Sequence, residues 1–405
     1  MTLRPLTPVD GSIELRDETS TRTLEASRIA VVHEWLSARA GSEILFEQLA
    51  LPFPSAHLFA LTRNEDVDFD FGNRHVSTSP LDLVGKLRHN RALSLPMMPA
   101  AWKAIRREPY DVVVTSTHAF GREFFQPEVD GVHCNYVHAP MRYAWNPNLD
   151  TRGNILGPLG AAARERLRRR DLASVEHVDS FAANSTEIAG RIQEFYDRDA
   201  VVIPPPVDVS FFRDCTPARG EYLMAASRWI PYKRLDLAIR VGAELDMPVV
   251  IAGSGPEEGA LRALAAQIHP HGVEFHVQPD RAAFRSLMAN AAAFLFPPHE
   301  DFGIIAVEVQ ATGTPVVALR AGGALDTVRD GVTGALAQDQ SVEAFTEATQ
   351  RCLALSDPSL VCRDHAEQFS APNFRRLVRS WVEGTVASSS SIAATAQAYE
   401  GPVAA

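Results

Sequence analysis

The stretch YLMAASRWIPYKRLDLA (222–238) decides the fold. Its first six residues are apolar or small and predict a buried strand, and the apolar spacing that starts at RLDLA predicts a helix. Arg228 ends this strand, and Lys233 opens the helix five residues later. Ligands of open α/β sheets bind beyond the carboxyl ends of the strands, so both cations are expected at a ligand-binding edge, where they suit a pyrophosphate. The alternative is that both are solvated surface cations.

The same alternation of strand and helix continues toward the C-terminus. Helical patterns separate four further predicted strands, which are PVVIAG (248–253), GVEFHV (272–277), AAFLFP (292–297) and TPVVAL (314–319). Strands that alternate with helices predict parallel βαβ units. The sequence therefore predicts one α/β domain over 206–371.

The N-terminal half shows the same rhythm without a sequence repeat. Its predicted strands are RIAVVH (28–33), AHLFAL (56–61), DVVVTS (111–116), VHCNYVH (132–138), SFAAN (180–184) and AVVIP (200–204). PPPVDVS (204–210) is a stiff connection that interrupts the pattern. We therefore predict two Rossmann-like α/β domains that face each other across a cleft.

Domain limits follow from these patterns. The first domain is expected over 28–205 and the second over 206–371, and the late amphipathic helix FRRLVRSWVEG (374–384) is expected to complete the first domain. Residues 1–27 lack a clear period, and 385–405 are small and polar, so both ends are expected to be flexible tails.

Composition narrows the function classes. The chain has 405 residues, 46% hydrophobic residues and a formal net charge of -11, which excludes a general nucleic-acid binder. No apolar run is long enough to span a bilayer, and the polar N-terminus predicts no secretory signal. The four cysteines lack metal-ligand spacing and indicate reduced thiols in a cytoplasmic protein.

The segment HEDFGIIAVEVQATGTPVVA (299–318) predicts a second part of the site. Phe302, Gly303 and Ile304 begin a helix without an acidic side chain at its tip, so its free backbone N–H groups can hold an anion. Glu300 lies in the loop before this helix. Glu308, in the second turn, is either an exposed helix residue or a carboxylate that accepts hydrogen bonds from ribose hydroxyls.

Glycine-rich loops supply weaker signals. Gly253 and Gly255 lie between a predicted strand and helix, and Val277 ends the next strand, so we treat all three as candidates for a donor loop. A tight turn explains the two glycines equally well. Ala40-Gly41-Ser42 is a matching loop in the first half, and the helix after it is expected to point its N-terminus at the cleft.

Arg228-x4-Lys233 followed by Glu300-x7-Glu308 resembles the retaining glycosyltransferases of family 4, which have the GT-B fold. The resemblance covers roughly residues 28–384. It implies that Arg228 and Lys233 hold the donor diphosphate, that Glu308 binds the ribose and that Glu300 lies by the donor sugar. Gly41 and residues 302–304 complete the implied diphosphate site. Ala40 departs from the family's Gly-Gly pair.

Three further segments, STHAFGR (116–122), HCNYVHAPMRYAWN (133–146) and VVIPPPVD (201–208), resemble bacterial O-antigen and polysaccharide mannosyltransferases. This resemblance implies GDP-mannose as the donor and places His118 beside the reacting sugar; a packed loop histidine is the alternative. Arg142 is a candidate for contact with acceptor or donor. Tyr143 either stacks on a sugar or fills the core.

The expected reaction is transfer of a hexose from a nucleotide-sugar donor to a hydroxyl of a saccharide, lipid-linked or small-molecule acceptor. Cations and helix dipoles would stabilise the leaving group, so neither a metal nor another cofactor is expected. The basic run ARERLRRR (163–170) is either a solvated helix face or a contact with the inner face of a membrane, which would make the cytoplasmic protein peripheral.

Rival functions remain. One alternative function is that of a sugar-nucleotide epimerase of the same fold. Another is that of a non-catalytic nucleotide-sugar-binding protein. A nicotinamide oxidoreductase would need G-x-G-x-x-G after the first strand, and the sequence after RIAVVHEW lacks it.

Overall fold

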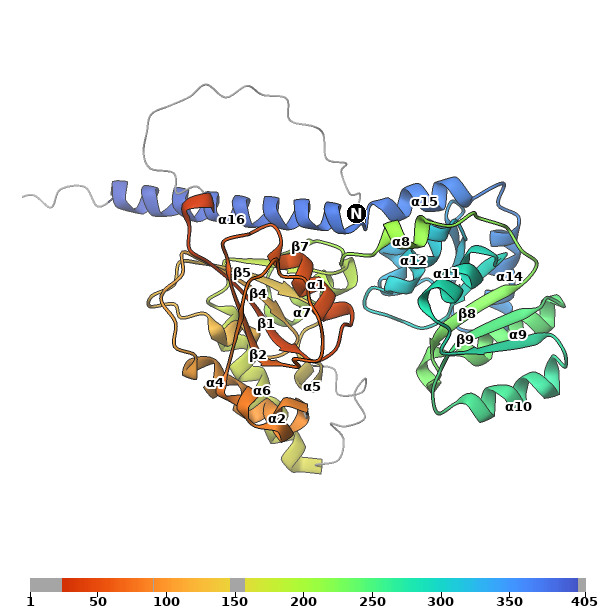
Figure 1. The fold of residues 1–405 in the computed structure, drawn as a ribbon, viewed down its shortest axis with the longest axis horizontal. Helices are drawn as coiled ribbons and strands as arrows, with labels where there is room; N and C mark the ends of the chain where they lie inside the picture. Colours follow the sequence, from red (N-terminus) through yellow and green to blue (C-terminus); the bar gives the residue numbers. More distant parts are fainter. Residues whose placement is uncertain (1–23, 90, 146–156, 400–405) are drawn as a thin grey trace, which may run out of the picture.

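The computed structural model describes residues 24–89, 91–145 and 157–399 and contains two parallel β-sheets (Figure 1). The strand order of the first sheet is β3-β2-β1-β4-β5-β6-β7, and that of the second is β10-β9-β8-β11-β12-β13. The strands pair in parallel throughout the described part of both sheets, for example β1 with β4 and β8 with β11. The predicted α/β fold with two Rossmann-like sheets is confirmed.

The first sheet forms because its strands are nearly continuous apolar runs, which suits a parallel sheet covered on both faces. β1 is buried along its whole length. The strands are β1 (Ile29–Leu36), β2 (His57–Arg63), β3 (Val76–Thr78), β4 (Val112–Thr117), β5 (Val132–Val137), β6 (Ser180–Ala183) and β7 (Ala200–Val202).

Helices cover both faces of this sheet, with one hydrophobic cluster under α1 and α16 and another under α4. The α-helices are α1 (Gly41–Ala50), α2 (Gly85–His89), α3 (Arg91–Ser94), α4 (Met98–Ala104), α5 (Arg142–Trp145), α6 (Gly157–Val175) and α7 (Thr186–Tyr196). The short 3-10 helices are η1 (Leu24–Ala26), η2 (Pro80–Leu83), η3 (Leu95–Met97) and η4 (Gly121–Phe124).

The second sheet has a hydrophobic cluster on each face. Its strands are β8 (Leu223–Arg228), β9 (Val249–Ser254), β10 (Val273–Val277), β11 (Ala293–Phe296), β12 (Val316–Leu319) and β13 (Gly334–Ala337). Its helices are α8 (Val209–Arg213), η7 (Pro231–Lys233), α9 (Leu235–Leu245), α10 (Glu258–Ile268), α11 (Arg281–Ala289), α12 (Ile304–Thr312), α13 (Ala324–Thr327), α14 (Val342–Leu353) and α15 (Ser359–Glu367).

The last helix, α16 (Ala371–Tyr399), returns from the second domain and runs along the first (Figure 1). Phe374, Val378 and Trp381 are buried in the first domain's core, and Trp381 Nε1 donates to Ser180 Oγ at 2.8 Å. Within the described residues, none of the helices combines the length and the apolarity needed to cross a membrane.

The prediction of a flexible tail from residue 385 is wrong as far as Tyr399, because α16 continues to that residue. Alanine has the highest helix propensity, and it is frequent in this segment. Hydroxyl groups also bond inside the helix: Thr385 donates to the Trp381 carbonyl and Ser388 to the Gly384 carbonyl. At the other end, Leu24–Ala26 forms a 3-10 turn inside the predicted tail 1–27. Residues 1–23 and 400–405 lie outside the described residues.

Candidate functional site

The two domains meet at the N-termini of α1 and α12. A Cβ atom added to Gly41, the first residue of α1, would lie 3.3 Å from Cδ1 of Ile304, the first residue of α12. Neither Ala40 nor Gly303 caps its helix with a side chain. The first backbone N–H groups of a helix have no acceptor within the helix, so two positive helix ends converge here, which is an arrangement that suits an anion.

The start of α12 is shaped by Gly303 and Phe302. Gly303 has a φ of 88°, in the left-handed region that favours glycine, and a Cβ there would approach the Phe296 ring to 2.8 Å. Phe302 is buried in the core of the second domain, so its side chain anchors the helix start. Of the three residues predicted at this tip, Gly303 and Ile304 are the partly exposed ones.

Lys233 and Glu300 form an ion pair at the carboxyl edge of the second sheet. The prediction that Lys233 opens the helix is wrong. Lys233 ends the 3-10 turn η7, and Arg234, with a left-handed φ of 52°, separates that turn from α9. Pro231 at the start of η7 favours this turn. Lys233 is almost buried, whereas Arg228 is exposed and donates only a long bond, 3.4 Å, to the Tyr232 hydroxyl.

Glu308 is half-buried on α12, and the described part of the chain offers its carboxylate no hydrogen bond or ion pair. Desolvation by burial raises its pKa to about 7, while the charge of Arg281 lowers the pKa and that of Asp208 raises it. A half-buried carboxyl without a protein partner has free acceptor capacity for a ligand.

His118 lies in the first domain, directly after β4. Its ring stacks on Trp35, with centroids 5.5 Å apart, and on His138, with centroids 4.1 Å apart. Burial lowers the pKa of His138 to about 3, so that ring is neutral. The backbone N–H of His118 donates to Glu34 Oε2 at 2.8 Å. His118 thus sits in a packed aromatic stack at the carboxyl edge of the first sheet, which is the edge where the sequence places it.

Arg142, at the start of α5, forms an ion pair with Asp301 of the second domain. Arg191 on α7 binds the same carboxylate, with Nη1 2.8 Å from Oδ1. Thr186 adds a third contact between the domains, because its backbone N–H and its hydroxyl each donate to Asp326 at 2.8 Å. The structure therefore brings Arg142 to the loop that carries Glu300. The side chain of Tyr143 lies outside the described residues.

The predicted donor-loop glycines have a packing function in the structure. A Cβ on Gly253 would collide with the Ser227 carbonyl, and one on Gly255 would collide with the backbone of Trp229. Trp229 N donates to the Ser254 carbonyl at 2.8 Å. These glycines let the loop after β9 lie against the segment that carries Arg228. Val277 ends β10 and is 49% exposed.

Sequence reasoning missed Glu34, Asp301 and Arg191. The one available signal was Glu34 itself, an acidic residue directly after the apolar run RIAVVH. The structure extends that strand to Leu36, so Glu34 is fully buried. The partners of Asp301 come from another domain, and local spacing does not encode them.

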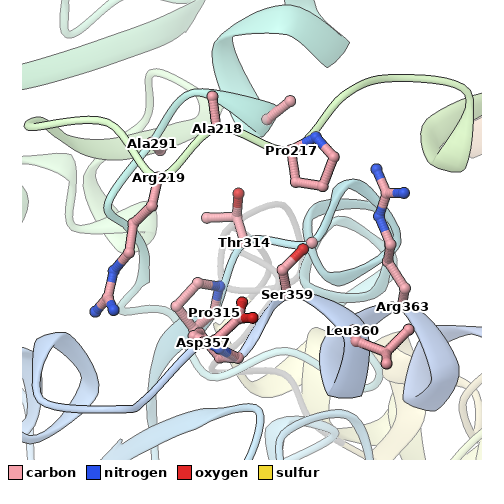
Figure 2. Close-up of a pocket in the computed structure, with 13 residues that line it drawn as sticks. Pro217, Ala218, Arg219, Ala291, Thr314, Pro315, Asp357, Ser359, Leu360 and Arg363 are labelled. Carbon is pink, nitrogen blue, oxygen red and sulfur yellow. The ribbon is translucent and has the colours of Figure 1, made fainter.

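A separate pocket of about 380 Å³ lies on the second domain (Figure 2). Thr314, Ser359 and Arg363 are among the residues that line it. Thr314 precedes β12, so the pocket opens at the amino edge of the sheet, opposite Glu300. It contains none of the predicted site residues.

Residues 212–369 match the family model of the glycosyl transferases group 1. A D-inositol 3-phosphate glycosyltransferase of Geodermatophilus obscurus is 31% identical over 368 residues, covering 80% of this chain and 77% of the relative. Another protein of that name, from Nocardia farcinica, is 33% identical over 204 residues, or 43% of this chain. The chain spans about half the length of two relatives: 45% of the Nocardia farcinica protein and 53% of a protein of the same name from Mycobacterium leprae.

Solved structures show the same fold. Anabaena Alr3699/HepE in complex with UDP superimposes with a TM-score of 0.60 at 17% identity, covering 87% of this chain and 98% of that chain. Sucrose-phosphate synthase from Thermosynechococcus elongatus superimposes with a TM-score of 0.60 at 18% identity, covering 92% of this chain and 100% of that chain. With its two facing Rossmann-like sheets and its relative matched over most of both chains, this chain belongs to the group 1 glycosyltransferases and has their GT-B fold.

Proposed function

We propose that this chain is a retaining glycosyltransferase that moves a hexose from a nucleotide diphosphate sugar to an acceptor hydroxyl. One observation carries the proposal: Lys233 pairs with Glu300, and Glu300 lies in the loop just before the uncapped N-terminus of α12. A cation and the N-terminus of a helix can bind a diphosphate, and a carboxylate can accept hydrogen bonds from sugar hydroxyls.

The leaving diphosphate would be stabilised by Arg228 and Lys233, together with the backbone N–H groups at Gly41 and at the start of α12. These groups are held in place before reaction, so they stabilise the developing charge without reorganisation. Lys233 would exchange its bond to Glu300 for one to phosphate, which frees Glu300 for the sugar. Glu308, for which the described residues supply no hydrogen-bond or ion-pair partner, would accept hydrogen bonds from the ribose.

In the proposed step the bond between the anomeric carbon and the leaving phosphate oxygen breaks, and a bond to the acceptor oxygen forms on the same face. The acceptor proton passes to the leaving phosphate. His118 would hydrogen-bond a sugar hydroxyl and stabilise the positive charge of the transition state. That the reaction requires neither metal nor cofactor stays a prediction, supported by the cation and the helix ends at the diphosphate site.

The donor and the acceptor are narrower proposals. GDP-mannose is the donor implied by the sequence resemblance, whereas Alr3699/HepE was crystallised with UDP-glucose. The names of the relatives add an inositol phosphate to the saccharide, lipid-linked and small-molecule acceptors. A donor panel therefore includes GDP-mannose and UDP-glucose, and the acceptor panel includes a cyclitol phosphate.

Contact of α6 with a membrane has less support than its sequence suggests. Arg168 donates to the Ala144 carbonyl at 2.8 Å, and Arg170 pairs with Glu123 at 2.6 Å. Arg169 and Glu165 lie 3.9 Å apart. Internal contacts thus occupy part of the basic run, and we favour a solvated helix face for residues 163–170 in a cytoplasmic enzyme.

A nucleotide-sugar panel tests the proposal, with binding read as the rise in melting temperature, since a ligand that binds only the folded state raises stability. The matched donor is then incubated with acceptors, and products are identified by NMR. Transfer to an acceptor supports the proposal. A changed nucleotide sugar without acceptor would indicate the rival epimerase, and binding without turnover would indicate a non-catalytic protein.

A further inference from the structure

Glu34 holds the turn that carries His118. Its Oε2 accepts the backbone N–H of His118 at 2.8 Å, and its Oε1 accepts those of Ala119 at 2.6 Å and Gly121 at 2.9 Å. The side chain is fully buried in β1, next to the β4 strand from which the turn departs. Three of the turn's N–H groups therefore depend on one carboxyl group.

The turn passes so close to Thr117 and Glu34 that there is no room for a side chain at Gly121. A Cβ on Gly121 would lie 2.7 Å from Thr117 Cγ2 and 3.5 Å from Glu34 Cγ. The following residue, Arg122, is buried and pairs with Asp171 on α6, and its Nε donates to Ser174 Oγ at 2.9 Å. The turn is thus fixed by β1 on one side and by α6 on the other.

The same strand also fixes the ring of His118. Trp35, the neighbour of Glu34, stacks on His118 with an interplanar angle of 13°, and His138 stacks at 11°. Ser116 holds His138 through an oxygen–nitrogen contact of 2.8 Å. Glu34 therefore holds the backbone of His118, and Trp35 holds its ring together with His138.

We propose that Glu34 is a positioning residue that fixes the backbone of His118 and thereby aims its imidazole at the donor sugar. This inference rests on the proposed function, because it needs a reacting sugar in the cleft. A misplacement of a catalytic side chain by about 1 Å can cost a hundredfold in rate, so a group that does not itself touch the substrate can still control turnover.

Glu34→Gln is the sharpest substitution, because it keeps the shape and removes one acceptor. The carboxyl group accepts hydrogen bonds on both oxygens, whereas an amide has one oxygen and one N–H₂. If the amide oxygen of the variant continues to accept the N–H groups of Ala119 and Gly121, the amide N–H₂ group faces the backbone N–H of His118. Two donors then face each other, and the hydrogen bond to His118 is lost. Asp130→Asn is the control for loss of a buried carboxylate: Asp130 also accepts two backbone N–H groups, from Tyr110 and Gln126, and it pairs with Arg107, but at the amino edge of the same sheet.

The test is a double-mutant cycle of Glu34→Gln and His118→Ala, with kcat and donor affinity measured for each variant. We expect Glu34→Gln to lower kcat tenfold or more, to leave nucleoside diphosphate affinity unchanged and to change kcat less than twofold in the His118→Ala background. Asp130→Asn is expected to lower kcat by the same small factor in both backgrounds. Equal losses from Glu34→Gln in both backgrounds would overturn the proposal.

A second readout separates this proposal from the proposed function. In histidine-labelled full-length protein, Glu34→Gln is expected to shift the His118 imidazole NMR signal and to leave that of His269, in the second domain, in place. This shift is observable whether or not any donor is turned over. If Glu34→Gln does not fold, Gly121→Ala replaces it in both measurements. An unmoved His118 signal, or loss of folding in both variants, would assign Glu34 to fold stability alone and contradict the proposal.

Discussion

Gly41 of the first domain faces Ile304 of the second so closely that a Cβ atom added to Gly41 would lie 3.3 Å from Ile304 Cδ1. At that distance even one methyl group must displace its neighbour by a few tenths of an ångström. The short distance leaves little room for a larger side chain at position 41, and it gives the first prediction.

Gly41→Val is expected to lower donor affinity at least tenfold, because the larger side chain forces the two helix N-termini apart. Donor binding is measured by calorimetry. Ile304→Ala in the same chain should restore much of the loss by removing the clashing atom. An equally weak double variant would show that the separation of the helices is not the cause.

Lys233→Ala is expected to weaken binding of a nucleoside diphosphate by a larger factor than binding of the nucleoside. A charge-assisted hydrogen bond contributes about 1.5–3 kcal/mol, or roughly tenfold or more in affinity. Arg234→Ala, beside it, removes a cation that pairs with Asp236 and serves as the control. Equal losses for both ligands would mean that Lys233 does not contact phosphate.

Glu308→Gln is expected to raise the donor dissociation constant roughly tenfold, because an amide accepts hydrogen bonds from ribose hydroxyls less strongly than a carboxylate. The comparison ligand is the 2′,3′-dideoxy nucleotide, which lacks those hydroxyls. If wild type and variant discriminate between the two nucleotides by the same ratio, Glu308 does not bind ribose.

The raised pKa of Glu308 predicts a dependence of stability on pH. Its value is about 7 in the folded chain against an ordinary 4.5, so the folded state binds this proton more tightly than the unfolded state. The stabilising contribution is complete below pH 4.5 and is lost as the pH rises through 7. Urea unfolding between pH 5 and 8 should therefore show a shallower decline for Glu308→Gln than for wild type; identical slopes would contradict the shift.

The ionisation of Glu308 also predicts how donor affinity depends on pH, and this trend is opposite to that of stability. Ionised Glu308 is the better acceptor for ribose hydroxyls, so donor affinity should rise with pH through 7. The charges of Asp208 and Arg281 act on this carboxyl group as well, and they therefore also affect how donor affinity changes with pH. The Glu308→Gln variant controls for them, and its pH profile should be flatter.

The sequence was sufficient for the fold because both sheets consist of apolar runs whose burial is a local property of each strand. It also indicated Glu308 and the tip of α12, since a glycine at the start of a helix and a carboxylate in its second turn form a local pattern. It did not reveal Glu34, whose three partners lie 84 to 87 residues away along the chain. The start of α9 was misplaced because the left-handed conformation of Arg234 has no strong sequence signal.

The contacts of Asp301 with Arg142 and Arg191 were also beyond local reasoning, because they join separate domains. Pairs of this kind depend on how two finished domains dock. The helical course of α16 beyond residue 385 was missed for another reason: its serines indicated disorder, whereas its alanines and its hydroxyl–carbonyl bonds favour a helix.

The most direct test of the account is the anomeric configuration of the product. The full chain is incubated with its matched nucleotide sugar and acceptor in the presence of EDTA, and the new glycosidic signal is read by NMR. We predict turnover without metal and a product whose anomeric configuration equals that of the donor. An inverted product, or turnover that stops with EDTA and returns with magnesium, would contradict the account.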